Sequence, residues 1–365
     1  MSSPQETEAE DASSSFEISD LPQIFADLTP VPQADGLNAV CRIDYPPHFT
    51  LAYDYFRALM QAAEVATPRA LRLTQLCLSQ NPANYTVWQY RRQCLAAQPN
   101  ATMWTMNDEL EWTATLGGDN PKNYQIWYHR RAILTRLHRQ EQQQQQQQHQ
   151  PTTVTLFSQL GQDELDYVAT VLQVDGKNYH AWTHRQWLLQ TLKDNALWEA
   201  ELQFVESLIA QDIRNNSAWN QRWFVTHHRG GDNSSTTTRI DRRKEMDYAL
   251  QVALQDPFNE SPFSYFLAMA KALHREDETV WETEILSFYQ AKLQSLWPDA
   301  DDEEDDQVSP FVLSTKVEWL VYQGDDVALD KVRTLLERLA ETVDPIRRKY
   351  WRFRQDQLCK PTGRA

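Results

Sequence analysis

Apolar side chains recur at helical spacing along most of the chain, and one short arrangement of polar and apolar residues returns several times. It consists of an Asn, a Trp four residues later and an Arg three residues beyond the Trp, as in Asn84, Trp88 and Arg91. Positions i, i+4 and i+7 lie on one face of an α-helix, so these three side chains form a single stripe. Leu95 continues the stripe. The arrangement predicts a helix that starts near the Asn and packs through its Trp.

Complete copies of this arrangement follow one another at intervals of roughly 40 residues, which is typical of an α-α repeat array. A fifth, degraded copy has Asn259 with Phe263. Upstream of the Asn, at a constant distance, stands a Glu followed by an apolar and then an aromatic residue, but the first repeat has Ala70 instead of the Glu. The complete copies are Asn84/Trp88/Arg91, Asn123/Trp127/Arg130, Asn178/Trp182/Arg185 and Asn215/Trp219/Arg222, and the upstream residues are Glu109, Glu164, Glu201 and Glu245.

Two helical elements in each repeat predict an all-α protein, built as a right-handed superhelix (a crescent) of tandem α-α hairpins. No alternating run of useful length supports a strand. We expect a single repeat domain over residues 21–358 that ends in C-terminal helices. Its repeats are predicted around residues 70–98, 106–138, 160–192, 197–229 and 242–275.

Several segments do not follow the repeat pattern. Residues 1–20 are acidic and rich in Ser, which predicts a disordered tail. Residues 139–150 are of low complexity and interrupt the repeats, so we expect an outward loop insertion there. The acidic run 298–306 is expected to be a solvated loop, and residues 359–365 a tail.

The residues shared by the repeats are those that helix stacking needs. Trp fills the space between packed helices, and Asn suits a cap or a bridge at the turn between them. Arg can cross a helix layer and bind a carboxylate with two hydrogen bonds, and the phased Glu is the obvious partner. We expect a pairing such as that of Arg130 with Glu109. These Trp and Arg residues are therefore interpreted as structural and not catalytic.

Composition and charge exclude several classes of function. The chain of 365 residues has a net charge of −16, which argues against nucleic acid and anionic membranes as partners. No segment approaches the ~18 apolar residues of a membrane span, and the N-terminus has no apolar run of a signal peptide. The four Cys have no zinc-binding spacing. We expect a cytoplasmic protein that binds no metal itself.

The residues that flank the Asn differ between repeats and carry the candidate chemistry. Helix starts expose N–H groups and the positive end of the helix dipole, so they favour anions. Cations, phenols and an imidazole at such positions suit a phosphorylated or carboxylate-bearing ligand, although exposed polar residues at a loop edge would look the same. No nucleophile triad or phosphate-binding Gly loop is present, which argues against a self-sufficient catalyst. These flanking residues are Lys122, Tyr124, Gln125, Asn178, Tyr179 and His180.

The tandem stretches KNYQIWYHRR and KNYHAWTHRQW resemble the repeats of protein prenyltransferase α subunits. The resemblance runs from about residue 25 to residue 355. FADLTPVPQADG at 25–36 and the segment DPIRRKYWRF from Asp344 are most similar to the α subunit shared by farnesyltransferase and geranylgeranyltransferase type I. The resemblance implies that this chain wraps a catalytic β subunit, is inactive alone, and helps to transfer a farnesyl or geranylgeranyl group from its diphosphate to the Cys of a C-terminal CaaX motif.

The same resemblance implies roles for individual residues. Lys122 matches a lysine that contacts the diphosphate, and Gln125 matches a glutamine that binds the C-terminal carboxylate of the peptide. Zinc, and in addition magnesium, is expected on or with the β subunit, and the substrates are CaaX-ending proteins such as small GTPases. By resemblance the catalytic residues are Lys122, Tyr124 and His180, and the substrate-binding residues are Gln125, Tyr85, Asn178 and Tyr179.

Two alternatives stay open at this point. One is the α subunit of the Rab geranylgeranyltransferase, which shares the repeats and would need an escort protein to present its substrate. The other is a non-enzymatic helical-repeat scaffold that only binds proteins. The scaffold explains the stacking but not the Lys-Asn-Tyr-Gln and Asn-Tyr-His clusters. An obligate partner would bury over ~2,000 Å², so the isolated chain should then be poorly soluble.

Overall fold

The computed structural model describes residues 17–36, 39–97, 104–148, 155–228, 241–276, 278–297 and 308–358. These residues form helices and connecting turns, and no β-strand occurs among them. They fall into two compact units, residues 1–192 and 193–365. The predicted all-α organisation in tandem α-α hairpins is confirmed, and each unit shows it by itself.

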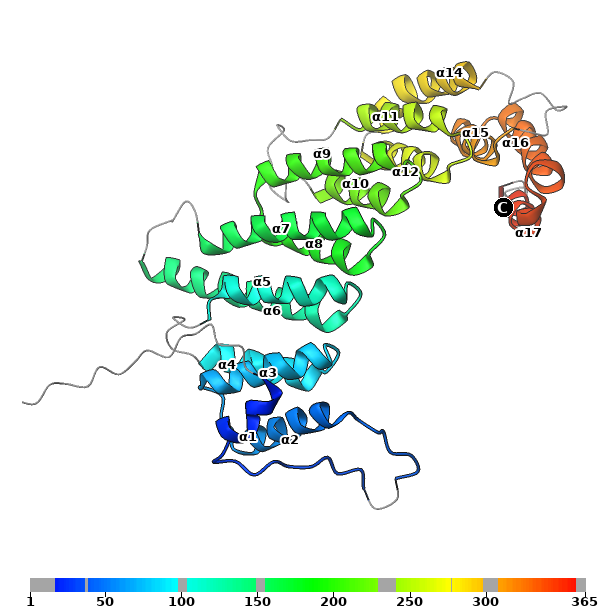
Figure 1. Cartoon of the computed structure of the whole chain (residues 1–365). Coiled ribbons are helices and arrows are strands. Elements are labelled where there is room, and N and C mark those ends of the chain that lie inside the picture. Colours follow the sequence, from blue (N-terminus) through cyan, green and yellow to red (C-terminus); the bar gives the residue numbers. More distant parts are fainter. Residues whose placement is uncertain are drawn as a thin grey trace, which may run out of the picture. The chain divides into compact units, whose positions relative to one another are not determined.

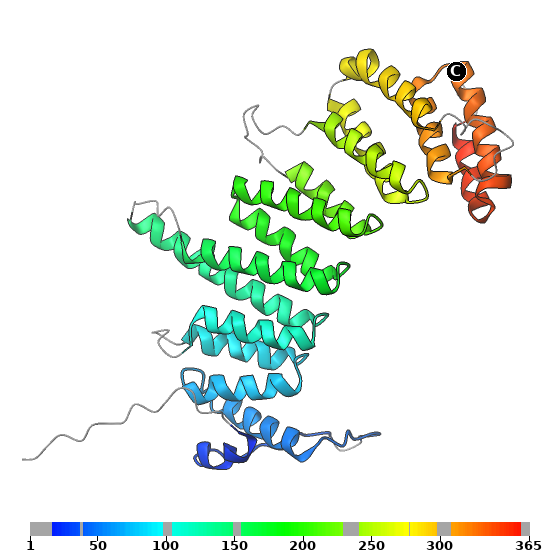
Figure 2. The same ribbon diagram turned by 45° about the horizontal axis from the view of Figure 1, so that its top comes forward.

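The first unit contains three hairpins that follow a short N-terminal helical region. The two helices of each hairpin lie side by side, and the turns that join them lie along one edge of the unit (Figures 1 and 2). The hairpins pair α3 with α4, α5 with α6 and α7 with α8. Their bounds are η1 Ile18–Asp20, α1 Leu21–Ile24, α2 Pro47–Gln61, α3 Pro68–Gln80, α4 Tyr85–Ala97, α5 Met106–Asp119, α6 Tyr124–Gln148, α7 Leu156–Val174 and α8 Tyr179–Leu192.

The second unit contains two hairpins, α9 with α10 and α11 with α12, and the helices α13 to α17 follow them. A π-helical segment precedes α14, and a second one follows α16. The bounds are α9 Asn195–Gln211, α10 Asn216–His228, α11 Arg242–Gln255, α12 Glu260–Glu276, α13 Glu278–Val280, η3 Trp281–Ile285, α14 Leu286–Leu296, α15 Pro310–Gln323, α16 Asp326–Arg338, η5 Leu339–Val343, η6 Pro345–Arg347 and α17 Arg348–Leu358.

The repeated Asn caps the second helix of each hairpin. In the first unit Asn123 accepts hydrogen bonds through Oδ1 from the backbone N–H groups of Gln125 and Ile126, at 2.8 and 3.3 Å. Such a cap satisfies N–H groups that a helix start leaves without partners. Asn178 also bridges repeats, because its Nδ2 donates to the carbonyl of Pro121 at 3.0 Å. The cap expected for Asn is confirmed, and the bond of Asn178 to Pro121 joins two repeats, which the sequence did not suggest.

The repeated Trp closes the turn of its own hairpin. The indole N–H of Trp127 donates to the carbonyl of Pro121 at 3.0 Å, and Trp88 does the same to Pro82 at 2.8 Å. Trp127 is only 6% exposed, and its ring lies against Tyr167 and His184. A buried indole needs an acceptor for its N–H, and the turn supplies one. Trp therefore joins apolar packing to the geometry of the turn.

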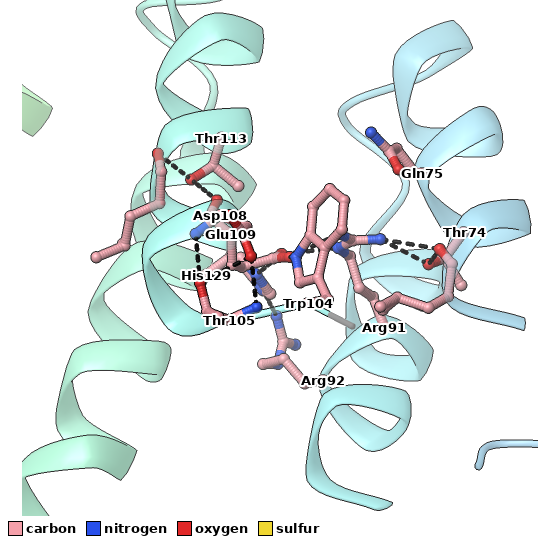
Figure 3. Close-up of polar contacts among 12 residues, drawn as sticks. Thr74, Gln75, Arg91, Arg92, Trp104, Thr105, Asp108, Glu109, Thr113 and His129 are labelled. Atoms are coloured by element: carbon pink, nitrogen blue, oxygen red, sulfur yellow. Dashed lines mark hydrogen bonds and ion pairs between the residues drawn. The ribbon is translucent and has the colours of Figure 1, made fainter. Parts of the chain in front are cut away.

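The repeated Arg pairs with a Glu, but in another register than the sequence suggested. Arg91 of the first repeat binds Glu109 of the second through Nε and Nη2, at 2.7 and 2.6 Å (Figure 3). Arg130 binds Glu164 of the third repeat in the same way. The expected pair of Arg130 with Glu109 is wrong, because Arg130, like Arg91, reaches forward to the next hairpin. The first repeat has Ala70 in place of Glu, and its helix α3 follows α2, which carries no such Arg.

Each of these Glu residues also binds its own repeat. His129 Nε2 lies 2.7 Å from Glu109, and Gln221 donates to Glu201 at 2.7 Å. The aromatic residue that follows the Glu stacks on the incoming guanidinium, as Tyr167 does on Arg130 with 4.1 Å from Cζ to the ring centroid. The buried carboxylate is therefore fully engaged, which offsets the cost of removing two charges from water.

The glutamine-rich segment does not form the expected loop up to Gln148. Helix α6 runs without interruption from Tyr124 to Gln148, and the last two residues of the expected loop, 149 and 150, lie outside the described residues. Gln is a good helix former, and no Gly or Pro interrupts the run. Glu141 anchors the extension by accepting the backbone N–H of Phe157 at 3.1 Å, near the start of α7. The insertion therefore lengthens a repeat helix.

The predicted tails and the predicted acidic loop are described by the structure only in part or not at all. Residues 17–20, expected within a disordered tail, contain the short helix η1 with Asp20 bonded back to the backbone of Glu17. Residues 1–16, the acidic run 298–306 and the tail 359–365 lie outside the described residues. The single repeat domain over 21–358 stays a prediction. Among the described residues, no helix is long and apolar enough to cross a membrane.

The buried network predicts that stability falls in acid. Burial opposes ionisation of Glu109, but Arg91 and His129 outweigh it and hold the pKa of its carboxyl below the usual 4.5. Burial lowers the pKa of His129 below 6.5. The unfolded chain therefore binds protons at both residues before the native state does, and the free energy of unfolding should fall as pH drops below about 6.5. Urea unfolding at pH 7, 6 and 5 measures this dependence.

His129→Gln is the matched control for this dependence, since Gln221 shows that an amide can make the same bond to a Glu. The variant keeps the donor and removes the titration of the imidazole. Its stability should depend less on pH between 7 and 5 than that of the native chain. An unchanged dependence would contradict the role given to His129.

Candidate functional site

Three helix starts on one edge of the first unit carry the sequence-predicted site residues. Helices α4, α6 and α8 begin at Tyr85, Tyr124 and Tyr179, each directly after its capping Asn. All three Tyr side chains are exposed, between 68% and 71%. Large exposed phenols at the same place in successive repeats are unusual for residues that only stack helices. The turns that hold them lie together along that edge (Figure 1).

Lys122 stands two residues before the start of α6 and extends toward the neighbouring turn. Its Nζ lies 3.4 Å from Oδ2 of Asp175, and its side chain is 76% exposed. An exposed ion pair of this kind contributes little to stability, about 0–1 kcal/mol. Its ammonium therefore remains available to an anion that approaches from solvent.

The starts of α6 and α8 are in direct contact. The rings of Tyr124 and His180 meet edge to face, with 4.2 Å between centroids, and Tyr179 lies 5.8 Å from the same imidazole. Asn178 adds its bond to the carbonyl of Pro121, the residue before Lys122. The structure therefore brings five predicted site residues together: Lys122, Tyr124, Asn178, Tyr179 and His180.

His180 is half-buried between the two Tyr rings, and its environment sets its charge. Burial lowers the pKa of its imidazole below the usual 6.5. At neutral pH the ring is therefore uncharged, and it offers one N–H donor and one acceptor. A neutral imidazole here can hydrogen-bond to a ligand without competing with Lys122 for negative charge.

Gln125 and Tyr85 make no described side-chain contact with these five residues, although Gln125 adjoins Tyr124 in the chain. Gln125 is half-buried in the first turn of α6, where its backbone N–H is capped by Asn123. Tyr85 occupies on α4 the position that Tyr124 occupies on α6. Among the described contacts, neither side chain bonds to the other five. Both nevertheless belong to the same row of helix starts.

The repeat residues expected to be structural do not belong to this row. Trp88, Trp127, Trp182 and Trp219 are at most 7% exposed, and so are Arg91, Arg130, Arg185 and Arg222. Sequence reasoning missed Asp175, which holds the ammonium of Lys122. The sequence did contain an indication: Asp175 stands three residues before the repeat Asn, and Asp212 and Asp256 stand at the same position in the next two repeats.

The chemistry of the row suits an anion. It combines the ammonium of Lys122, phenolic O–H donors, a neutral imidazole and the N–H groups at helix starts. The described residues include no group of three or more His, Cys, Asp or Glu side chains that could hold a metal ion. The row can therefore bind and orient a diphosphate or a carboxylate.

Comparison with known proteins shows where this arrangement occurs. The profile of the protein prenyltransferase alpha subunit repeat matches residues 67–98, 106–137, 162–192 and 198–229. The protein farnesyltransferase/geranylgeranyltransferase type-1 subunit alpha of Dictyostelium discoideum is 30% identical over 343 residues, which are 92% of each chain. That of Arabidopsis thaliana is 33% identical and covers 92% of this chain and 94% of its own.

A solved structure agrees in fold. A chain of the Candida albicans protein geranylgeranyltransferase-I complexed with GGPP superposes with a TM-score of 0.70 at 28% identity, over 95% of this chain and 100% of that one. The match in sequence and fold extends over nearly the whole chain, well beyond the repeat stripe alone. This chain belongs to the family of protein farnesyltransferase/geranylgeranyltransferase type-1 α subunits.

Proposed function

We propose that this chain is the α subunit of a heterodimeric protein prenyltransferase and that it wraps a catalytic β subunit. The heterodimer transfers farnesyl or geranylgeranyl from its diphosphate to the Cys sulfur of a C-terminal CaaX motif. One observation carries the proposal: the rings of Tyr124 and Tyr179 contact His180 at adjoining helix starts, and Lys122 pairs with Asp175 in the turn before α8. A cation, phenols and an imidazole in this arrangement suit an anion. Family membership and the GGPP in the related Candida complex support a prenyl diphosphate as that anion.

The proposed roles follow from the chemistry of each side chain. In the transfer the Cys sulfur bonds to C1 of the prenyl group, and the diphosphate leaves with the electron pair. Lys122 stabilises the negative charge that grows on the departing diphosphate, and Tyr124 and His180 donate hydrogen bonds to it. Gln125 binds the C-terminal carboxylate of the peptide, and Tyr85, Asn178 and Tyr179 line the substrate-binding surface. Zinc, with magnesium, belongs on or with the β subunit.

Activity should therefore need both chains, in the cytoplasm where CaaX-ending proteins such as small GTPases are made. The test is to co-express this chain with a farnesyltransferase-type β subunit and to assay the purified complex. The substrates are a CaaX peptide with farnesyl or geranylgeranyl diphosphate. Turnover by the complex, and by neither chain alone, supports the proposal. A stable chain that neither assembles nor transfers would favour the Rab-type subunit first and a protein-binding scaffold next.

Lys122→Ala should lower kcat of the heterodimer by about 10- to 100-fold, since a hydrogen bond to a charged group contributes about 1.5–3 kcal/mol. Assembly and the affinity for peptide should be unchanged, because Lys122 is exposed and contacts only Asp175 among the described ion pairs. Steady-state kinetics and gel filtration measure these effects. Lys177→Ala is the matched control, because Lys177 has the same position before α8. Loss of assembly in Lys122→Ala would instead make Lys122 structural.

A further inference from the structure

Asp175 is held rigidly beside the flexible Lys122. Its Oδ1 accepts a hydrogen bond from the backbone N–H of Lys177 at 3.1 Å, inside the turn before α8. Its Oδ2 lies 3.4 Å from Lys122 Nζ. The Asp175 side chain is 33% exposed against 76% for Lys122. The Asp175 carboxylate is therefore the fixed member of the pair. It orders the ammonium at the end of the long Lys122 side chain.

The second unit repeats this ion pair without the candidate site. Arg214 Nε lies 2.6 Å from Oδ2 of Asp256, whose Oδ1 accepts the N–H of Phe258 at 3.2 Å. Arg214 and Asp256 occupy the positions of Lys122 and Asp175 relative to the repeat Asn. Their helices α10 and α12, however, begin with Asn216 and Glu260 and not with Tyr. An ion pair at this position thus occurs in both units, and among the described residues it is combined with phenols and an imidazole in the first unit.

We propose that Asp175 is a positioning residue that holds the ammonium of Lys122 beside the start of α8, ready for the anionic ligand. The proposal rests on the proposed function and names a residue that the resemblance did not supply. A free Lys side chain has many rotamers, and fixing it in one of them costs conformational entropy. An ammonium has three N–H donors, so an ion pair with Asp175 leaves donors for a diphosphate.

The negative charge of Asp175 also repels a diphosphate, so it weakens binding of the prenyl diphosphate in the ground state. The N-terminus of α8 lies beside the same turn and reduces that repulsion. Negative charge on the diphosphate grows in the transition state, so there the ordering of Lys122 should outweigh the repulsion by Asp175. Loss of this ordering should therefore lower kcat. The KM for the prenyl diphosphate should be unchanged or lower when the charge is removed.

The test is Asp175→Asn in the assembled heterodimer. The amide oxygen can still accept the N–H of Lys177, as Asn81 accepts that of Ala83 at 3.2 Å in the first repeat. We expect kcat to fall about two- to fivefold, the range of an exposed ion pair. In the Lys122→Ala background the same change should have no further effect on kcat. Asp175→Glu, which keeps the charge, should restore part of the loss.

Asp256→Asn is the matched control, because it breaks the equivalent pair where no candidate site lies. It should leave kcat unchanged. An increase in kcat for Asp175→Asn, or an equal loss with and without Lys122, would overturn the positioning role. If Lys122→Ala itself left kcat unchanged, the proposed function of the row would fail, and this outcome is distinct from a failure of Asp175 alone.

Discussion

Arg130→Ala is expected to lower the free energy of unfolding by about 3–5 kcal/mol, the cost of leaving one member of a buried ion pair without its partner. Arg130 and Glu164 are each 2% exposed, and their pairing joins two hairpins. Arg130 also donates to Thr113 at 2.7 Å and stacks on Tyr167, so truncation removes several contacts at once. Urea unfolding followed by tryptophan fluorescence and circular dichroism measures the loss.

The neighbouring Arg131 is exposed on the same helix and supplies the control. Its guanidinium lies over the ring of Trp187, 5.0 Å from the centroid, so Arg131→Ala should lower stability by no more than about 1 kcal/mol. A double-mutant cycle then tests the register of the pairing: Arg130 should couple strongly to Glu164 and weakly to Glu109. Stronger coupling to Glu109 would contradict the forward register seen in the structure.

Trp127→Ala should destabilise the chain by about 3–5 kcal/mol, because it removes a core aromatic and leaves a cavity between hairpins. The indole contributes both its contact with Tyr167 and its bond to the carbonyl of Pro121. The variant should therefore show a lower yield of folded protein and a lower urea midpoint. Assembly with a β subunit should weaken with it, since the turn that Trp127 closes carries the site residues.

Two further substitutions separate packing from the bond at the turn. Trp127→Phe keeps an aromatic ring and loses the N–H donor, so it should cost less than Trp127→Ala. Tyr128→Ala removes an aromatic that is 59% exposed and should have little effect on stability. A well-folded but inactive Trp127→Ala would show that Trp127 acts in the chemistry and not in packing.

The repeat stripe was readable from the sequence because helix geometry is local. A spacing of three and four residues decides which side chains share a face, whatever the rest of the chain does. Asn123 as a cap and Trp127 as a buried aromatic follow from that geometry, and the structure confirms both. The choice of Glu109 as the partner of Arg130 failed because spacing within a repeat cannot show which neighbouring hairpin the side chain reaches.

The long α6 was missed for a different reason. Low complexity suggested a loop, but composition describes the tendency of a free segment, and this one continues a helix that is already formed. A helix that has been nucleated is extended at little cost by Gln residues. The contact of Glu141 with the start of α7, which supports that extension, links residues that no periodicity connects.

By itself the sequence determined the all-α class, the helix starts and the stripe of Asn, Trp and Arg, all of which follow from local spacing. The seven residues proposed for the site came from the resemblance to prenyltransferase α subunits, and their roles stay a proposal. Only the tertiary structure decided that Arg130 pairs forward with Glu164, that Tyr124 meets His180, and that Asp175 holds Lys122. These contacts join different hairpins, and they depend on how neighbouring helices stack, which is set by packing in three dimensions and not by the order of residues within one helix.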